Sequence, residues 1–438
     1  MKKKTVLSMA VSLMLAVLTG CGSVPEAATE TTVSTNTADE EVAPGTTADG
    51  PSGKISIWTW NDNSFIIDPY MEENPNAEIE LTVIDSGEYL TKIQTTVASG
   101  GKLPDVVWGE ISNRGQLFSM DILKDLSVEP FNINTGDYDA SVINTMKNED
   151  GVIVGVESIL APVGLAYQKS VAKECLGTDE IDEIKAMIPD WDSFIELGKK
   201  VQAESGVPMF LSLGDVYYIV NGQMKESRIN DGVIHKDVVE NLFEQICKFR
   251  DAGIVGKIEQ WTPAWYASFG TGSSVFAPMP AFGIANWIAP NLEEESSDWQ
   301  LLTPPGGGFS WGGTCWGITK DCQNDELAWD FIKYATKGNA TVIRANRGEI
   351  PSAAGALSEE LLNAPQPIFD NQLVNKVYLE EIVPTIRTKI PTQYDFLDIC
   401  TIELVLTSMN TDYSFDAQAA TELYIQEMTN QSPELVIN

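Results

Sequence analysis

The chain has 438 residues, of which 63 are acidic and 28 are basic, so its formal net charge is −35 with the single histidine neutral. A chain this acidic repels nucleic acid and anionic membrane surfaces, and we expect neither as a partner. Its length exceeds that of one typical domain and predicts two lobes.

The first 20 residues have the pattern of a secretory signal peptide. Three lysines at positions 2 to 4 precede an apolar run, Val6–Leu18, that is too short for an ordinary membrane span. The segment ends in LTGC, with Cys21 last, which resembles the bacterial lipobox. That resemblance implies cleavage before Cys21 and diacylation of this cysteine, with palmitate as an acyl chain. The protein would then be anchored to the outer face of the cell membrane without spanning it; a soluble secreted protein cleaved nearby is the alternative.

Residues 21–53 are expected to form the lipidated cysteine and a disordered acidic tether. The segment is rich in Thr, Ala, Ser, Glu and Asp and contains no Lys or Arg. It has too few large apolar residues to offset the entropy of ordering. Apolar periodicity begins at Ile55, where we expect the folded part to start.

Strands and helices are expected to alternate along the folded part, which predicts an α/β architecture with a largely parallel sheet. Strands are predicted at 54–62, 77–85, 103–110, 152–157 and 164–169. Helices are predicted around 90–99, from the cap Asp190 to 206, at 238–250 and at 324–336, and the part after Pro351 is expected to be mostly helical. Trp191 and Trp329 are assigned to the core.

Besides Cys21 the chain has five cysteines. Their odd number and their spacing fit no zinc pattern, so we expect no metal and no cofactor. We interpret them as small buried apolar residues, although a Cys315–Cys322 disulfide is an alternative in an exported protein. The five are Cys175, Cys247, Cys315, Cys322 and Cys400.

Six motifs follow the lipobox in chain order: ISIWTW (55–60), ASGGKLPDVVWGE (98–110), GVIVGVESILAPVGLAYQK (151–169), IPDWDSFIELGKKV (188–201), FSWGGTCWGITKDCQNDELAWDFIKYAT (309–336) and RGEIPS (347–352). In this order they resemble the motifs of the family 1 extracellular solute-binding proteins of bacterial ABC importers, the maltose-binding-protein-like group. Three features depart from the family pattern: Glu157 replaces a frequent proline, Gln168 replaces a frequent asparagine, and the spacing changes in GTGSSVFAPMPAFGIANWI (270–288).

The resemblance implies a type II periplasmic-binding-protein-like fold, in which two α/β lobes are joined by hinge strands around a ligand cleft. The N-terminal lobe would comprise 54–160 and about 317–350, and the C-terminal lobe about 161–316 and 351–438. The implied function is capture of a sugar or oligosaccharide for ABC permease subunits that work with a separate ATPase. The protein is expected to be a monomer and not an enzyme.

A sugar has apolar ring faces and hydroxyl rims, so its receptor needs aromatic platforms and carboxylate or amide groups. At predicted strand ends the chain offers Trp60, Asn61 and Asp62, and then Glu110 and Asn113. A core position for Trp60 and a turn-capping role for Asp62 are the alternatives at the first of these strand ends.

Four other tryptophans and one arginine complete the candidate ligand-binding set. Trp265 and Trp287 are candidate platforms. Trp311 and Trp316 are five residues apart, so an unbroken strand would point them to opposite faces; one is expected to face the cleft, and we favour Trp311. Arg347 is a candidate for a sugar hydroxyl or for an ion pair between the lobes.

Three alternatives stay open from the sequence. The same fold could bind a polyamine, a peptide or an amino acid; the protein could be a glycan-binding surface adhesin; or it could be a glycoside-active enzyme. A glycoside-active enzyme would need a pair of carboxylates, which could arise by chance among the many Asp and Glu residues. A Ser-His-Asp triad would need the single histidine, His235, which no GxSxG sequence accompanies. We therefore propose no catalytic residue.

Overall fold

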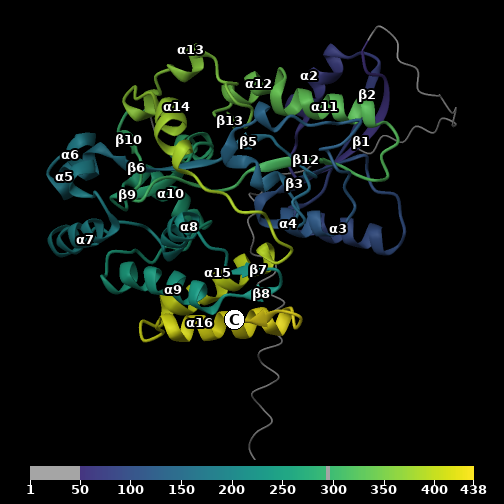
Figure 1. Cartoon of the computed structure of the whole chain (residues 1–438). Coiled ribbons are helices and arrows are strands. Elements are labelled where there is room, and N and C mark those ends of the chain that lie inside the picture. Colours follow the sequence, from purple (N-terminus) through teal and green to yellow (C-terminus); the bar gives the residue numbers. More distant parts are fainter. Residues whose placement is uncertain (1–49, 293–295) are drawn as a thin grey trace, which may run out of the picture.

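The structure is a computed structural model that describes residues 50–292 and 296–438. The predicted signal peptide, the predicted lipidation site Cys21 and the tether as far as residue 49 lie outside this part. The described chain forms two lobes, each with its own main sheet, and a layer of helices at the bottom of the view (Figure 1).

The first lobe is built on a five-stranded sheet with the order β2-β1-β3-β12-β4. Alternate residues of β1 point into the core, so Ile55 and Ile57 are fully buried while Lys54 is exposed, as expected of a strand with period two. The strands are β1 (Gly53–Thr59), β2 (Ala77–Val83), β3 (Val106–Glu110), β4 (Val156–Glu157) and β12 (Thr314–Ile318). The helices are α2 (Ser64–Glu73), α3 (Ser86–Ala98), α4 (Ile111–Ser119), α11 (Asp325–Lys337) and α12 (Ala340–Asn346).

The second lobe has a sheet centred on β6 (Pro162–Gln168), whose seven residues are all buried. Three strands pair with β6 in antiparallel register: β9 (Phe276–Pro280), β10 (Trp299–Leu302) and β11 (Phe309–Ser310). The helices of this region are α5 (Lys169–Leu176), α6 (Ile181–Met187), α7 (Trp191–Ser205), α10 (Pro263–Thr271), α13 (Glu359–Leu362) and α14 (Val374–Lys376).

A helical layer lies against both lobes (Figure 1). It consists of α8 (Leu213–Gln223), α9 (Lys236–Asp251), α15 (Asp395–Thr411) and α16 (Ala417–Gln431), with the short strands β7 (Ile229–Asn230), β8 (Val233–Ile234) and β14 (Val436–Ile437). Single helical turns fill the connections at Thr135–Asp137, Ala140–Val142, Asn144–Met146, Ile284–Ile288, Ala289–Asn291, Pro367–Phe369, Val377–Ile382 and Val383–Thr385.

Two stretches of chain run from one main sheet to the other. The first passes from β4 through β5 (Ile159–Leu160) into β6, and the second passes from β11 into β12. Strand β13 (Ile350–Pro351) pairs with β5 beside the first stretch. The site described below lies where these connections meet.

The prediction of a largely parallel sheet was wrong. In the first sheet β1 runs parallel to β2 and β3, but β12 is antiparallel to both β3 and β4. In the second sheet every pairing is antiparallel. The chain leaves the first sheet at the end of β4 and returns from the second lobe at β12. Because β12 runs back toward the first lobe, it pairs with β4 in the antiparallel direction.

Most predicted elements are confirmed. The first three predicted strands correspond to β1, β2 and β3, and the Asp190 carboxylate caps α7 by accepting the Ser193 N–H at 2.7 Å. The strand predicted at 152–157 is present only as the two residues of β4. Cys315 and Cys322 form no disulfide with each other. Both are buried, as is Cys247, but Cys175 and Cys400 are only partly buried, so the interpretation of all five cysteines as buried residues was wrong for these two.

Candidate ligand-binding site

The connection between β11 and β12 is held in place by backbone hydrogen bonds to Ala161, directly before β6, and to Ile111, directly after β3. The Trp311 N–H donates to the Ala161 carbonyl at 2.9 Å, and the Ile111 N–H donates to the Gly313 carbonyl at 3.1 Å. Gly312 and Gly313 have φ values of +94° and +125°, which favour glycine. A Cβ on Gly313 would lie 2.9 Å from Glu157 Oε1. The two glycines therefore break the strand and turn Trp311 away from the first sheet.

Trp311 joins three other tryptophans in a group that we call the indole cluster: Trp261, Trp265, Trp287 and Trp311. Ring centroids within the cluster lie 5.1 Å apart for Trp265 and Trp287 and 5.3 Å apart for Trp287 and Trp311. The Trp261 ring contacts all three others, at 5.2 to 5.8 Å. Tyr218 of α8 stacks on Trp311 at 3.9 Å with an angle of 17° between the rings.

The cluster has a buried base and an exposed outer ring. Trp265, Trp287 and Trp311 are 1%, 4% and 7% exposed, whereas Trp261 is 36% exposed. Local sequence explains two of these positions. Thr262 caps α10 by accepting the Trp265 N–H, and Pro263 is favoured in the first turn, so Trp265 is placed on the inner face of the helix while Trp261 stays outside it.

Glu110 lies beside this connection because β3 and β12 pair with Thr314 opposite Glu110. Its Oε2 atom accepts from the backbone N–H and the hydroxyl of Ser112, while Asn113 Oδ1 accepts the Glu110 N–H at 3.4 Å; together these bonds form the cap of α4. Burial raises the pKa of Glu110 above its ordinary value, against the opposing effect of the Ser112 hydrogen bonds. Asn113 is buried at 6% exposure.

A buried ion pair lies directly behind the two glycines. Arg114 Nη2 donates to Glu157 Oε1 at 3.0 Å, and the Thr145 hydroxyl donates to Glu157 Oε2 at 2.8 Å. Burial raises the pKa of Glu157, and the Arg114 charge opposes that rise. Glu157 stands where the family frequently has proline, and its carboxylate packs directly against Gly313.

The remaining sequence-predicted residues lie elsewhere in the first lobe. Trp60 is half-buried and contacts Tyr89 and Trp108 edge-on. Asn61 and Asp62 are exposed, and Asp62 Oδ1 accepts the Ser64 N–H at 2.9 Å, which is the turn-capping role considered for it. These residues follow β1, whose carboxyl end lies at the same sheet edge as that of the parallel strand β3, where Glu110 stands.

Trp316 and Arg347 make contacts of a different kind. Trp316 is fully buried in β12, between Trp108 and Phe331. The exposed Arg347 places its guanidinium 4.2 Å from the ring centroid of Phe65 in α2. Neither residue belongs to the indole cluster.

The structure thus brings three of the predicted platforms, Trp265, Trp287 and Trp311, into one cluster. It also shows two residues that sequence reasoning missed: Trp261, which belongs to the cluster, and Tyr218, which stacks on Trp311. A signal for Trp261 was present, because a residue that precedes a Thr-Pro helix start lies outside the helix and cannot be buried on its inner face.

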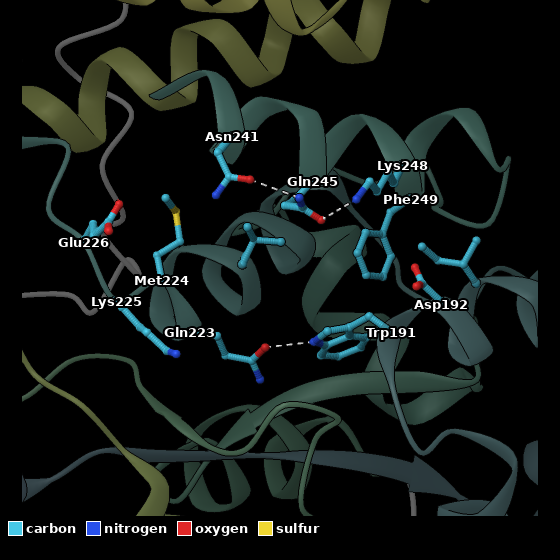
Figure 2. A pocket seen from close by; sticks show the side chains of 12 residues that line it. Trp191, Asp192, Gln223, Met224, Lys225, Glu226, Asn241, Gln245, Lys248 and Phe249 are labelled. Atoms are coloured by element: carbon cyan, nitrogen blue, oxygen red, sulfur yellow. Dashed lines mark hydrogen bonds between the residues drawn. The ribbon is translucent and has the colours of Figure 1, made fainter. Parts of the chain in front are cut away.

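A separate hollow of about 360 Å³ lies between α7 of the second lobe and α8 and α9 of the helical layer (Figure 2). Its polar groups already bond to one another: Trp191 Nε1 donates to Gln223 at 2.8 Å, Gln245 Nε2 donates to Asn241 at 3.1 Å, and Lys248 Nζ donates to Gln245 at 3.0 Å. Trp191, assigned to the core, packs on Phe194 and Phe249 as well as lining this hollow. We place the candidate site at the indole cluster, because that cluster lies at the connections between the lobes.

Comparison with known proteins gives a family and a fold. The family model of bacterial extracellular solute-binding proteins matches residues 66–367, and no curated protein sequence matches the chain. A solved extracellular solute-binding protein of family 1 is 19% identical, with a TM-score of 0.78 over 87% of this chain and 99% of that chain. The sugar-binding protein MalE of Xanthomonas citri is 16% identical, with a TM-score of 0.70 over 87% and 98% of the two chains.

A third similar structure carries a bound sugar. The ABC-transporter-associated binding protein of B. animalis subsp. lactis Bl-04, solved in complex with β-1,6-galactobiose, is 17% identical, with a TM-score of 0.65 over 88% of this chain and 100% of that chain. At these identities the likeness shows the two-lobed α/β fold of periplasmic binding proteins.

Proposed function

The chain belongs to the family of bacterial extracellular solute-binding proteins, and from this premise we propose that it is the substrate-binding lipoprotein of an ABC importer that captures a sugar or oligosaccharide between its lobes. The observation that carries the proposal is the indole cluster, in which a 36% exposed ring, Trp261, rests on three buried ones. The sugar-binding proteins among the similar structures support a carbohydrate rather than another solute.

The chemistry of the cluster suits a sugar ring. An exposed indole face offers an apolar platform to ring C–H groups, and an indole whose neighbours are buried is fixed before the ligand arrives. Hydroxyl groups at the rim of the same ring need charged or amide partners. Glu110 of β3 is a predicted candidate, because it lies opposite Thr314, which follows Trp311 closely in the chain.

Capture follows from a shift in population between open and closed forms. We propose that the first lobe comprises 54–160 and about 317–350, and the second about 161–316 and 351–438, so that both inter-sheet connections act as hinge strands. A ligand that contacts both lobes stabilises the closed form, and the permease subunits recognise that form. No bond of the ligand is broken in this scheme, so the protein acts as a receptor and not as an enzyme. We propose that it works as a monomer.

Location follows from the N-terminal pattern. We propose that Cys21 carries the lipid anchor and holds the receptor at the outer face of the membrane, where it meets permease subunits that work with a separate ATPase. Within residues 50–292 and 296–438, no helix has the length and apolar character needed to cross a membrane.

Calorimetric titration of the purified protein with a panel of oligosaccharides and, separately, of polyamines, peptides and amino acids tests the proposal. We expect one class of oligosaccharide to bind, small-angle scattering to show compaction with that sugar, and no new reducing ends to appear. Binding of a polyamine or a peptide with no response to any sugar would overturn the carbohydrate assignment. Bound sugar without compaction would contradict lobe closure.

A further inference from the structure

Trp261 stands in a connecting segment, residues 254–262, that has no helix and contributes only an isolated bridge at Val255. Its φ is +65°, a left-handed conformation that is costly for a large side chain. Such a backbone persists only where its surroundings hold it. The contacts of this segment therefore decide where the exposed indole points.

Backbone bonds tie the start of the segment to the strand-like residues before α8. The Gly256 N–H donates to the Phe210 carbonyl at 2.8 Å, and the Ile258 N–H donates to the Leu211 carbonyl at 3.2 Å. The side chain of Gln260, directly before Trp261, makes the next contact: its Nε2 atom donates to Asp215 Oδ1 at 2.6 Å.

The two carboxylate oxygens of Asp215 accept hydrogen bonds from different segments. Oδ2 accepts the Ser212 N–H at 3.1 Å and completes the capping box of α8. Oδ1 faces the connecting segment and accepts from Gln260. Helix capping needs one acceptor oxygen, so the second oxygen has a separate role. Asp215 is 2% exposed, which excludes direct contact with a ligand in this conformation.

Gly214 gives an independent indication that the position of Gln260 matters. It lies in the first turn of α8, where any side chain is tolerated by the backbone. A Cβ at this position would lie 2.3 Å from Gln260 Oε1 and 2.6 Å from Gln260 Cδ. The absence of a side chain at residue 214 leaves the space that Gln260 occupies against Asp215.

We propose that Asp215 and Gln260 form a buried anchor that positions the Trp261 indole for the ligand, and so set ligand affinity without contacting the ligand. The inference rests on the proposed function in one respect, that Trp261 is the sugar platform. An indole held in place before binding loses less conformational freedom when the sugar arrives, so loss of the anchor weakens binding. Asp215 and Gln260 are thus positioning residues.

Two substitutions remove the anchor from opposite sides and spare the α8 cap. Gln260→Ala deletes the donor, and Gly214→Ala displaces it by steric contact. Asp215→Asn is the conservative rescue, because its amide oxygen can cap α8 and Gln260 can reverse its own amide to accept from the new nitrogen. Gln245→Ala is the matched control, since Gln245 makes side-chain hydrogen bonds in the hollow of Figure 2 and not at the cluster.

The test uses fluorine NMR of the full chain labelled with 5-fluorotryptophan. The resonance of Trp261 is assigned as the one that disappears in Trp261→Phe. In the absence of ligand, we expect Gln260→Ala and Gly214→Ala to shift or broaden the Trp261 resonance. Asp215→Asn and Gln245→Ala should leave it in place. Unchanged Trp261 resonances in both anchor variants would overturn the proposal, and this readout needs no ligand.

Calorimetry with the oligosaccharide found in the panel gives the second readout. We expect Kd to rise between about twofold and tenfold in the two anchor variants, the range for freeing one ordered side chain. A displaced Trp261 resonance with unchanged sugar affinity would show that the anchor holds the segment but that the ligand does not use Trp261. That outcome would overturn the role of the anchor in ligand affinity and would count against Trp261 as the sugar platform. A Trp261 resonance that is not displaced in the anchor variants would count against the anchor alone.

Discussion

The molecule contains two tryptophan groups with similar ring spacing and different exposure. In the first lobe Trp60, Trp108 and Trp316 pack at centroid distances of 5.0 and 6.5 Å, and Trp108 and Trp316 are 3% and 0% exposed. In the indole cluster the rings are 5.1 to 5.8 Å apart, and Trp261 is 36% exposed. Ring packing alone therefore does not distinguish a core from a platform.

Trp108 and Trp316 differ from Trp261 in the backbone that presents the ring, and the half-buried Trp60, directly after the end of β1, is intermediate between them. Trp108 and Trp316 lie within paired strands of the first sheet, opposite each other in register. Trp261 lies on a connecting segment at positive φ, held by contacts to α8. Strand positions lock an indole into the core, whereas a segment outside regular structure can leave one face open to a ligand.

The largest expected effect is on stability in the first group. Trp316→Ala removes a fully buried indole and should lower the free energy of unfolding by about 3–5 kcal/mol. Trp261→Ala should lower it by much less, because the ring is already partly in water. Urea unfolding of the two variants measures the difference, and equal losses would remove the distinction between the groups.

The next effect concerns the ion pair at the connection between the groups. Glu157→Gln leaves the buried Arg114 charge without its partner and should destabilise the protein by about 3 kcal/mol or more. The matched control is Glu78→Gln, which breaks an exposed pair with Lys54 and should cost less than about 1 kcal/mol. Comparable losses in the two variants would show that the pair behind Gly313 is not effectively buried.

The third effect is a pH dependence of stability at Asp215, the buried carboxyl that contacts the segment of Trp261. Burial raises the pKa of Asp215 to about 6 from its ordinary 3.8. The folded state therefore holds more protons than the unfolded state between these values, so this group's contribution to stability is full below pH 4 and is lost as pH rises through 6. We expect Asp215→Asn to gain stability relative to the native chain, on the order of 1–3 kcal/mol, between pH 4 and pH 7.

Chemical denaturation of both proteins at several pH values measures this difference. Groups common to the two chains, such as Asp395 with its pKa raised by burial to about 7, cancel in the comparison. A difference that does not vary with pH would mean that the Asp215 carboxyl has an ordinary pKa.

The smallest effect is expected at Arg347. Its contact with the Phe65 ring is exposed, so Arg347→Ala should cost about 0.5–1 kcal/mol of stability. If Arg347 instead meets a ligand hydroxyl, its loss will weaken sugar binding with little effect on unfolding. Calorimetry and unfolding of the same variant separate the two roles.

Sequence reasoning recovered the parts of the fold that local patterns control. The alternation in β1 and the Asp190 cap are each determined by neighbouring residues. The direction of β12 depends on where the chain returns from the second lobe, and no local pattern encodes it.

The site was recovered in part for the same reason. Trp265, Trp287 and Trp311 were identified singly, but their convergence depends on contacts between segments far apart in sequence. The sequence analysis named Trp265 and not Trp261 as a candidate platform. The structure shows that α10 buries Trp265 and leaves Trp261 partly exposed. Exposure is a property of the folded surroundings, so the outermost ring appears only in the structure.

The most direct test of the central claim is calorimetric titration of the native chain, Trp261→Phe and Trp261→Ala with the oligosaccharide found in the panel. We predict affinity about tenfold or more lower in Trp261→Ala, a smaller loss in Trp261→Phe, and nearly unchanged unfolding in both. Equal affinity in all three proteins would contradict a ligand seated on the indole cluster.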